Sequence, residues 1–429
     1  MEKKIICPSC CFKFHPNDAV FLFGKKYVVP DMEDLSFNTP EFEAHGFVQR
    51  IFVTNAKGVR QELDKRCCPN CKFVLPTGYG MRKTLLISIL GDARSGKSVF
   101  LTMLINQLEN NPDFPSKLTF IGDNKVREYF YNTYQKPLLK DHTLVSSTKR
   151  KRIPPYAFNY WYRYRDESGD YKENSIDIIF YDIAGEDLRD HDGIRNNGYN
   201  IKDSSGLIYL VDPTNFNKLA DLFRFSDQAL VDAIPADNSN QAIFDNLYNF
   251  FIGFDSGQSE IPLALTISKA DLFKFVNFDF FNNKPSNRLQ NVLPDEKHHG
   301  AVYMPSVKGL HQEVRELISY IGEDGVYNNA LGCFKHVQCF AVSSLGKKPI
   351  VEQISDPDTN ETIEKGYVDG GLEPFRVKEP FYWILMRNGL LLKHENNRYT
   401  DFDQVATPEG KLLAFWKRVL GVLNNKFRA

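Results

Sequence analysis

Apolar runs alternate with amphipathic stretches along most of this chain, and the alternation predicts an α/β fold. Runs bounded by turn residues predict strands at Leu85–Leu90, Tyr156–Arg165, Ile176–Tyr181, Gly206–Val211, Pro262–Ile267 and His336–Val342. Helical spacing follows the first strand and recurs at Lys218–Ala233, Asn240–Phe251, Val307–Ile321, Pro380–Asn388 and Pro408–Lys426. We therefore expect a mostly parallel six-stranded sheet with helices on both faces, in which the turn Arg165–Asp170 makes the second and third strands antiparallel.

The pattern also divides the chain. The predicted segments are a small β-rich module at 1–80, a main domain at 81–391 and a helical C-terminal extension at 392–429. The turn Pro76–Gly80 marks the first boundary, because Pro and Gly interrupt regular structure there. Insertions are expected near 275–305 and 349–372, and the second predicts a mobile loop because it contains Asp-Pro-Asp-Thr-Asn.

A glycine-rich loop directly after the first predicted strand carries the strongest chemical signal. Gly91–Ser98 reads G-x-x-x-x-G-K-S, in which backbone N–H groups cradle phosphate oxygens, Lys97 reaches the β and γ phosphates, and Ser98 ligates Mg²⁺. A helical pattern begins here, so the phosphates would also lie at a helix N-terminus. The residues expected around the phosphates are Gly91, Asp92, Ala93, Arg94, Ser95, Gly96, Lys97, Ser98 and Val99. The chain is therefore predicted to bind a nucleoside triphosphate.

Two polar motifs at later strand ends indicate which nucleotide this is. Asp182 and Gly185 form D-x-x-G, in which the carboxylate can hold Mg²⁺ through water and the glycine N–H can bind a γ-phosphate. Ser268, Lys269 and Asp271 form S-K-x-D after the fifth strand. Asp271 can accept two hydrogen bonds from guanine, whereas adenine has no such pair of donors, and the Lys269 stem can lie over the base. The second motif therefore favours guanine.

A further motif, Ser343-Ser344-Leu345, ends the sixth strand and could offer backbone N–H groups to the guanine carbonyl. Together, G-D-A-R-S-G-K-S, D-I-A-G-E, S-K-A-D and S-S-L resemble the Ras-like G domain of the TRAFAC class of P-loop GTPases, over about residues 84–390. More narrowly, D-I-A-G-E, S-S-L-G and the stretch Arg376–Trp383 are similar to the bacterial double-GTPase families. Members of those families are predicted to act in pairs, often in conflict or antiviral loci.

The resemblance implies a GTP-binding switch that hydrolyses GTP slowly. The positions it assigns are Lys97, Thr148 and Glu186 for catalysis, and Ser98, Thr148 and Asp182 for Mg²⁺. We prefer Thr148 to Thr143 because it lies nearer the second strand. Glu186 stands where Ras-like proteins have the glutamine that orients water, and its charge opposes an incoming phosphate. Ser268 stands where common G domains have Asn or Thr, which predicts a looser base pocket.

Two near-identical turns predict a metal site in the first segment. Cys7-Pro-Ser-Cys10 and Cys68-Pro-Asn-Cys71 can each place two thiolates on one ion, giving a tetrahedral Cys₄ zinc site. The pattern resembles a zinc ribbon, and the zinc would be structural because protein fills all four positions. Redox thiols are the weaker alternative, since a thioredoxin-type C-x-x-C occurs singly. Further candidate ligands are Cys11, Cys67 and His15.

Composition and charge narrow the possible partners. The chain is 42% hydrophobic and 25% charged, which is typical of a soluble protein, and its net charge of −1 gives no general attraction to nucleic acid or acidic membranes. We expect no membrane span, because no apolar run is long enough to cross a bilayer. We also expect a cytoplasmic protein, because Cys7 and Pro8 interrupt the start of the chain and leave no signal-peptide core. The basic run Lys149–Arg152 is read equally well as a solvated loop or as a functional segment. As a functional segment it could supply an arginine to the phosphate or dock an acidic partner. Binding of nucleic acid is a weaker alternative.

The leading interpretation is a GTP-dependent switch, with a protein effector or a partner GTPase. One rival is an ATP-driven remodelling NTPase, against which S-K-A-D argues. The other is an assembly scaffold that binds nucleotide without turnover, with which the charge of Glu186 is compatible.

Overall fold

The computed structural model describes most of the chain between Lys4 and His394. The described residues are 4–10, 12–29, 50–54, 58–92, 95–111, 115–122, 124–144, 155–166, 170–183, 188, 201–215, 239–252, 258–274, 301–320, 322–355 and 362–394. Several predictions lie outside them: the site residues Ala93, Arg94, Thr148, Gly185 and Glu186, the helices at Lys218–Ala233 and Pro408–Lys426, and most of the 275–305 insertion and of the C-terminal extension.

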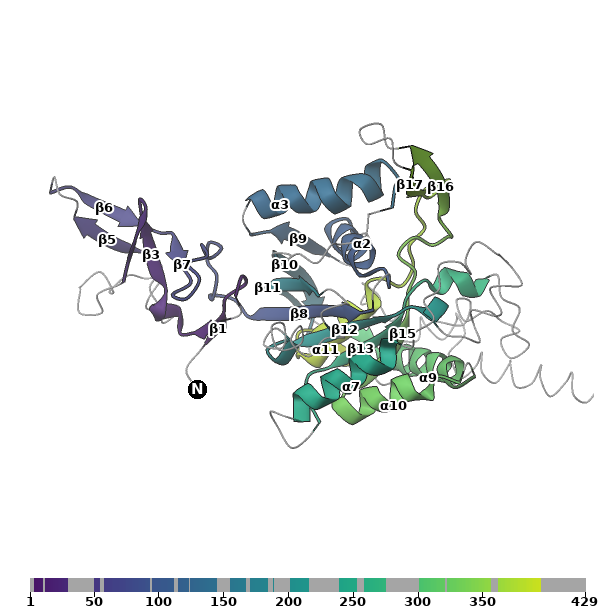
Figure 1. The fold of residues 1–429 in the computed structure, drawn as a ribbon. Helices are drawn as coiled ribbons and strands as arrows, with labels where there is room; N and C mark the ends of the chain where they lie inside the picture. Colours follow the sequence, from purple (N-terminus) through teal and green to yellow (C-terminus); the bar gives the residue numbers. More distant parts are fainter. Residues whose placement is uncertain are drawn as a thin grey trace, which may run out of the picture.

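A seven-stranded sheet forms the centre of the molecule (Figure 1). Its order is β15 (Val337–Ala341), β13 (Leu263–Ile267), β12 (Gly206–Val211), β8 (Thr84–Gly91), β11 (Tyr171–Asp182), β10 (Tyr156–Arg165) and β9 (Ser116–Phe120). The first five are parallel, whereas β10 is antiparallel to both β11 and β9. The predicted α/β class and mostly parallel sheet are confirmed, and β9 is an additional strand.

The central strands β8, β12 and β13 are mostly apolar and almost entirely buried. Every residue of β12 and β13 is buried, as is every residue of β8 after Thr84. Continuous apolar runs of this kind suit strands that are covered on both faces, because neither face needs polar side chains.

Helices cover both faces of this sheet (Figure 1). Gly206 faces α11 (Glu379–Arg387), because a Cβ built on it would lie 2.5 Å from the Ile384 side chain. Tyr209 faces α7 (Ser239–Ile252), because its ring centroid lies 4.6 Å from that of Phe244. Positions 206 and 209 point to opposite faces of β12, so α11 and α7 lie on opposite sides. Beside α11 lies α2 (Lys97–Glu109), because Asn111 donates to the Tyr382 hydroxyl at 2.9 Å. Beside α7 lies α10 (Asp324–Cys333), and α9 (Met304–Tyr320) lies against α10.

The insertion at 349–372, expected as a mobile loop, contains an antiparallel hairpin. It comprises β16 (Ile350–Ser355) and β17 (Thr362–Tyr367). Two helical elements precede Leu144 in the chain: α3 (Asn124–Phe130) and the π-helix Tyr131–Lys140. The hairpin contacts the segment after them, because Leu144 N–H donates to the Gly366 carbonyl at 2.7 Å. It therefore reaches the stretch just before the proposed Thr148 switch. A shorter parallel pair joins β14 (Ala301–Tyr303) to β18 (Leu392–His394).

The amino-terminal segment is built from short strands. They are β1 (Ile5–Ile6), β2 (Lys13–Phe14), β3 (Val20–Phe23), β4 (Lys26–Val28), β5 (Ile51–Thr54), β6 (Arg60–Leu63) and β7 (Arg66–Cys67). Phe21, Ile51 and Leu63 form a small core of their own, whereas Cys7, Cys68 and their neighbours join the main core. The cysteine-bearing half of this segment therefore packs in the main core.

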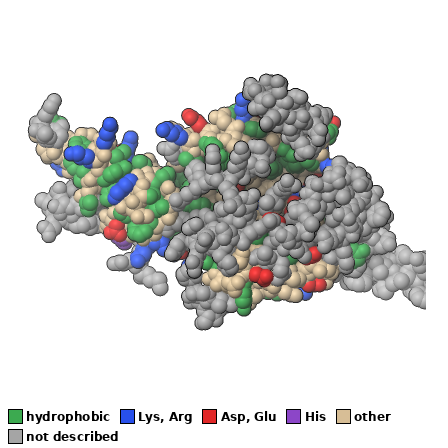
Figure 2. All heavy atoms as spheres, viewed as in Figure 1, with side chains coloured by type: hydrophobic (Ala, Val, Ile, Leu, Met, Phe, Trp, Pro, Cys, Tyr) green, Lys and Arg blue, Asp and Glu red, His purple; other side chains and the backbone are tan. Residues whose placement is uncertain are grey.

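The surface of this segment mixes apolar and basic side chains, as the left side of Figure 2 shows. Its exposed large apolar side chains are Phe12, Tyr27, Val29, Val59 and Val74. None of the described helices is long and apolar enough to cross a membrane.

Candidate nucleotide and metal sites

The polar motifs of the sequence meet at one edge of the sheet. The strands β8, β11, β12, β13 and β15 are parallel, so their carboxyl ends lie side by side, where α/β proteins bind ligands. The glycine-rich loop, Asp182, the S-K-x-D motif and the S-S-L motif all begin at these ends.

The first residue of the glycine-rich loop has no room for a side chain. Gly91 has φ 143°, and a Cβ there would lie 2.4 Å from the Leu210 carbonyl oxygen, so that only glycine fits. The Ser95 hydroxyl closes the turn by donating to the Asp92 carbonyl at 2.8 Å. The Lys97 amine donates to the carbonyls of Gly91 and Asp92 at 2.9 and 2.8 Å. The lysine therefore lies over the loop that phosphates would occupy.

The next helix begins inside this loop. Gly96, with φ 84°, precedes α2, and no side chain caps its first turn, which contains Ser98 and Val99. The backbone N–H groups of a helix N-terminus and the positive end of the helix dipole favour an anion at this end.

Ser98 and Asp182 lie side by side beneath the loop. The Ser98 hydroxyl donates to Asp182 Oδ2 at 2.7 Å. Desolvation raises the pKa of Asp182, while the nearby Lys97 charge and the Ser98 hydrogen bond act in the opposite direction. A hydroxyl and a carboxylate at this spacing suit Mg²⁺, which prefers oxygen ligands, and the cation would offset the desolvation of the carboxylate.

Hydrogen bonds to neighbouring strand ends fix the S-K-x-D motif. Asp271 is buried and accepts a hydrogen bond from the Ser343 hydroxyl, which itself accepts from Gly346 N–H at 2.8 Å. The hydroxyl of Ser268 donates to the Val211 carbonyl at 3.1 Å, so it joins two strand ends. Ser344 and Leu345 complete the turn after Ser343. The structure thus brings Asp271 and the S-S-L motif together.

Asp212 is a site residue that the sequence analysis missed. Its carboxylate lies 2.6 Å from the Lys269 amine and also accepts from Thr214 N–H at 3.0 Å. The ion pair fixes Lys269, which has φ 51°, at the strand ends. The signal was present, because Asp212 directly follows the apolar run Gly206–Val211.

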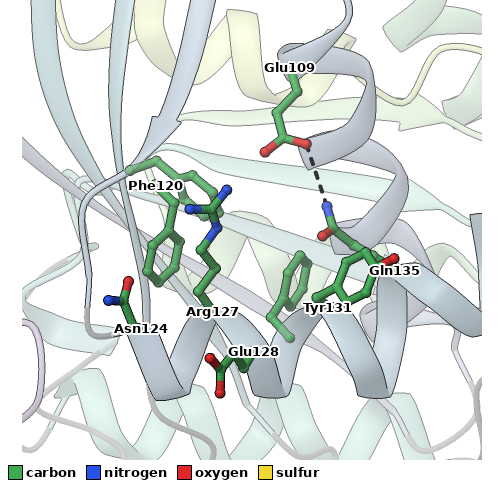
Figure 3. A pocket seen from close by; sticks show the side chains of 9 residues that line it. Glu109, Phe120, Asn124, Arg127, Glu128, Tyr131 and Gln135 are labelled. Carbon is green, nitrogen blue, oxygen red and sulfur yellow. Dashed lines mark hydrogen bonds between the residues drawn. The ribbon is translucent and has the colours of Figure 1, made fainter.

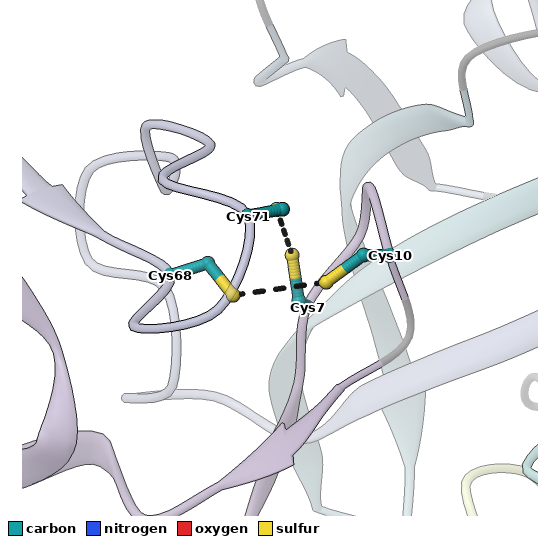
Figure 4. A group of neighbouring side chains, drawn as sticks. All are labelled: Cys7, Cys10, Cys68 and Cys71. Carbon is teal, nitrogen blue, oxygen red and sulfur yellow. Dashed lines mark hydrogen bonds between the residues drawn. The ribbon is translucent and has the colours of Figure 1, made fainter.

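The four cysteines of the two C-P-x-C turns form one cluster (Figure 4). Their sulfur atoms all lie within 4.8 Å of one another, with 3.6 Å between Cys7 and Cys71 and 3.7 Å between Cys10 and Cys68. A disulfide would need about 2.05 Å. Sulfurs on a tetrahedral zinc, with bonds of about 2.3 Å, lie about 3.8 Å apart. The cluster could therefore hold a metal ion such as zinc.

The protonation of these thiols fits a cation site. Burial raises the pKa of Cys7 well above its ordinary range and raises the pKa of Cys68 to about 11. Burial acts the same way on Cys10, but hydrogen bonds, first that of the Phe12 backbone, outweigh it and lower the pKa. A bound cation would stabilise the thiolates that burial opposes.

The further candidate ligands are engaged elsewhere or lie outside the described residues. His15 Nδ1 accepts from Asn17 N–H at 3.2 Å, and the Cys67 thiol donates to the Lys65 carbonyl at 3.8 Å. Cys11 is outside the described residues.

A separate hollow of about 440 Å³ lies between the end of α2, β9, β10 and the α3–π-helix segment (Figure 3). It is lined by Glu109, Phe120, Asn124, Arg127, Glu128, Phe130, Tyr131, Gln135 and Phe158. Glu109 points toward Gln135, whose amide donates to it at 3.5 Å. None of the residues expected to bind nucleotide lines this hollow.

Three comparisons with known proteins bear on these sites. No family model matches the chain. A protein of Mycolicibacterium smegmatis (strain ATCC 700084 / mc(2)155), named as a proposed ESX-1 scaffolding and assembly protein, SaeC, is 22% identical over 353 residues, which cover 76% of this chain and 80% of that protein. A crystal structure of Sup35 complexed with GMPPNP aligns with 62% of this chain at 9% identity. The chain spans only 39% of that Sup35 chain, and the TM-score of 0.23 is too low to support an argument.

Proposed function

We propose that this chain binds a guanine nucleotide with Mg²⁺ and that the bound nucleotide controls assembly with a partner protein. The observation that supports this best is the meeting of Lys97, Ser98, Asp182 and Asp271 at one edge of the sheet. The six expected strands and their antiparallel pair are consistent with a Ras-like G domain, to which β9 is added.

In this proposal each residue has one role. Lys97 would turn from the loop carbonyls to the β and γ phosphates, and Ser98 and Asp182 would hold Mg²⁺, which neutralises phosphate charge. Asp271 would accept two hydrogen bonds from guanine, and the Lys269 stem, fixed by Asp212, would lie on the base.

Hydrolysis would be slow. Lys97, Thr148 and Glu186 remain the proposed catalytic residues, and the negative charge of Glu186 would disfavour attack on the phosphate. The name of the SaeC relative concerns scaffolding and assembly, which favours a long-lived nucleotide-bound state over rapid turnover. The conflict or antiviral role remains a prediction that this relative does not support.

We also infer that Cys7, Cys10, Cys68 and Cys71 hold a structural zinc ion. The exposed apolar and basic side chains of the same segment support a protein partner, because apolar patches beside charged residues mark interaction surfaces.

Base recognition tests the proposal against its ATP-driven rival. The nucleotide that co-purifies with the chain is identified by chromatography, and GDP, ADP and xanthosine diphosphate are titrated by calorimetry. Asp271→Asn should weaken GDP binding at least about tenfold, because a charged hydrogen bond is lost, and should improve xanthosine diphosphate binding.

Asp324→Asn, at the start of α10, is the matched control and should leave all three affinities unchanged. Equal affinity of the unaltered chain for GDP and ADP would refute guanine recognition. Single-turnover GTP hydrolysis, with and without a partner, then separates a slow switch from a scaffold without turnover.

A further inference from the structure

Among the described residues, the end of β11, which carries Asp182, pairs with a strand on one side only. The pairing of β11 with β8 continues to Asp182 opposite Ile89, but its pairing with β10 ends at Phe180 opposite Tyr156. Tyr181 and Asp182 therefore pair with β8 alone, whereas residues 177–180 of β11 pair with strands on both sides.

Tyr181 supplies a second attachment at this point. Its hydroxyl donates to the Pro8 carbonyl at 2.8 Å, and its side chain is buried. Phe180 packs 6.2 Å from Phe381 of α11, so Tyr181 points to the opposite face of the sheet. Asp182 points back to the α11 side, where Ser98 lies. The strand end is thus attached on one face through Tyr181 and on the other through Asp182.

The acceptor of this bond belongs to the cysteine cluster. Pro8 lies between Cys7 and Cys10, and Ser9 N–H donates to the Cys7 sulfur at 3.4 Å within the same turn. A metal held by the cluster would fix this turn, and therefore the carbonyl that receives the Tyr181 hydroxyl.

We propose that Tyr181 is a positioning residue that couples the cysteine cluster to the Mg²⁺ ligand Asp182. The proposal rests on the proposed nucleotide function. By linkage, a cluster that holds metal then strengthens Mg²⁺-dependent nucleotide binding, and bound Mg²⁺ and nucleotide strengthen metal retention by the same factor.

The test compares two tyrosine variants of the full-length chain. Tyr181→Phe removes the hydroxyl and keeps the ring. Tyr79→Phe is the matched control, because the Tyr79 hydroxyl donates to the Ile6 carbonyl at 2.7 Å, two residues from Pro8, but does not adjoin Asp182. Affinity for fluorescent GDP is measured across a Mg²⁺ titration in chelator-free, metal-stripped buffer, and the zinc content of every sample is determined.

Tyr181→Phe should reduce the gain in GDP affinity that Mg²⁺ provides by about threefold to tenfold, the range for loss of one hydrogen bond, with Mg²⁺-free affinity unchanged. Tyr79→Phe should leave the gain intact. Equal effects of the two variants, or an unchanged gain in Tyr181→Phe, would overturn the proposal. If the unaltered chain binds no GDP at all, the proposed function fails instead.

A second measurement needs no variant. Zinc transfer from the unaltered chain to a colorimetric chelator is followed with and without Mg²⁺ and GDP. Coupling predicts slower transfer when both are present, and an identical rate would contradict it.

Discussion

Gly346 closes the turn that holds the Ser343 hydroxyl against Asp271. Its φ is 82°, and a Cβ there would lie 1.8 Å from the Glu373 carbonyl oxygen. Gly346→Ala should therefore destabilise the chain by at least about 2 kcal/mol, measured by denaturant unfolding, and should also weaken GDP binding.

Gly309→Ala is the control. Gly309 lies within α9, with no atom within 4 Å of an added Cβ, so alanine should stabilise the chain by about 0.5–1 kcal/mol. Similar effects of the two substitutions would mean that the turn relaxes easily.

Site residues whose partners lie far away in the sequence are hard to predict from the sequence. The S-K-x-D and S-S-L motifs were recognisable because their chemistry is local. The Asp212–Lys269 pair and the Tyr181–Pro8 bond join positions 57 and 173 residues apart, so their geometry depends on the completed fold.

Among the elements, α9, α10 and β15 meet at His311. Its Nδ1 accepts from Cys339 N–H at 3.1 Å, so Nε2 carries the proton and faces the Tyr327 hydroxyl at 3.3 Å. Burial, together with the Arg315 charge, lowers the pKa of His311.

A lowered folded-state pKa means that protonation opposes folding. The stability that neutral His311 contributes should be fully present above its ordinary pKa of about 6.5 and be lost as pH falls through the lower folded value. Unfolding free energies measured from pH 7.5 to 5 should fall less steeply in His311→Gln, which keeps an acceptor but does not titrate. Parallel pH profiles would contradict this assignment.

Element type was predictable where burial is uniform. The apolar runs predicted the bounds of β8, β12 and β13 to within one residue, since strands covered on both faces need few polar positions. The edge strand β9, Ser-Lys-Leu-Thr-Phe, is too short and polar to stand out. The hairpin β16–β17 was read as a loop because turn residues between its strands dominated the pattern.

At the scale of the whole molecule, the cysteine cluster and the sheet share one core. Cys7 and Cys68 pack in the same apolar cluster as β8 and α2. Cys68→Ser should therefore lower the melting temperature of the main transition by at least about 5 °C, instead of creating a separate early transition.

Cys67→Ser is the matched control for that experiment. Cys67 is buried beside the cluster but its thiol donates to Lys65, so serine should preserve zinc content and chelator resistance. Scanning calorimetry with zinc analysis checks both variants. An early, separate transition in Cys68→Ser would mean that the segment folds independently.

The strand β9 also limits how another protein can join this one. It pairs with residues 158–162 of β10, so a partner strand cannot pair with that part of β10. The border it leaves is five residues long and includes the exposed Lys117, and lysine at a sheet border discourages strand addition. This border therefore favours a protein that docks through side chains, and single substitutions of those side chains should weaken such a contact.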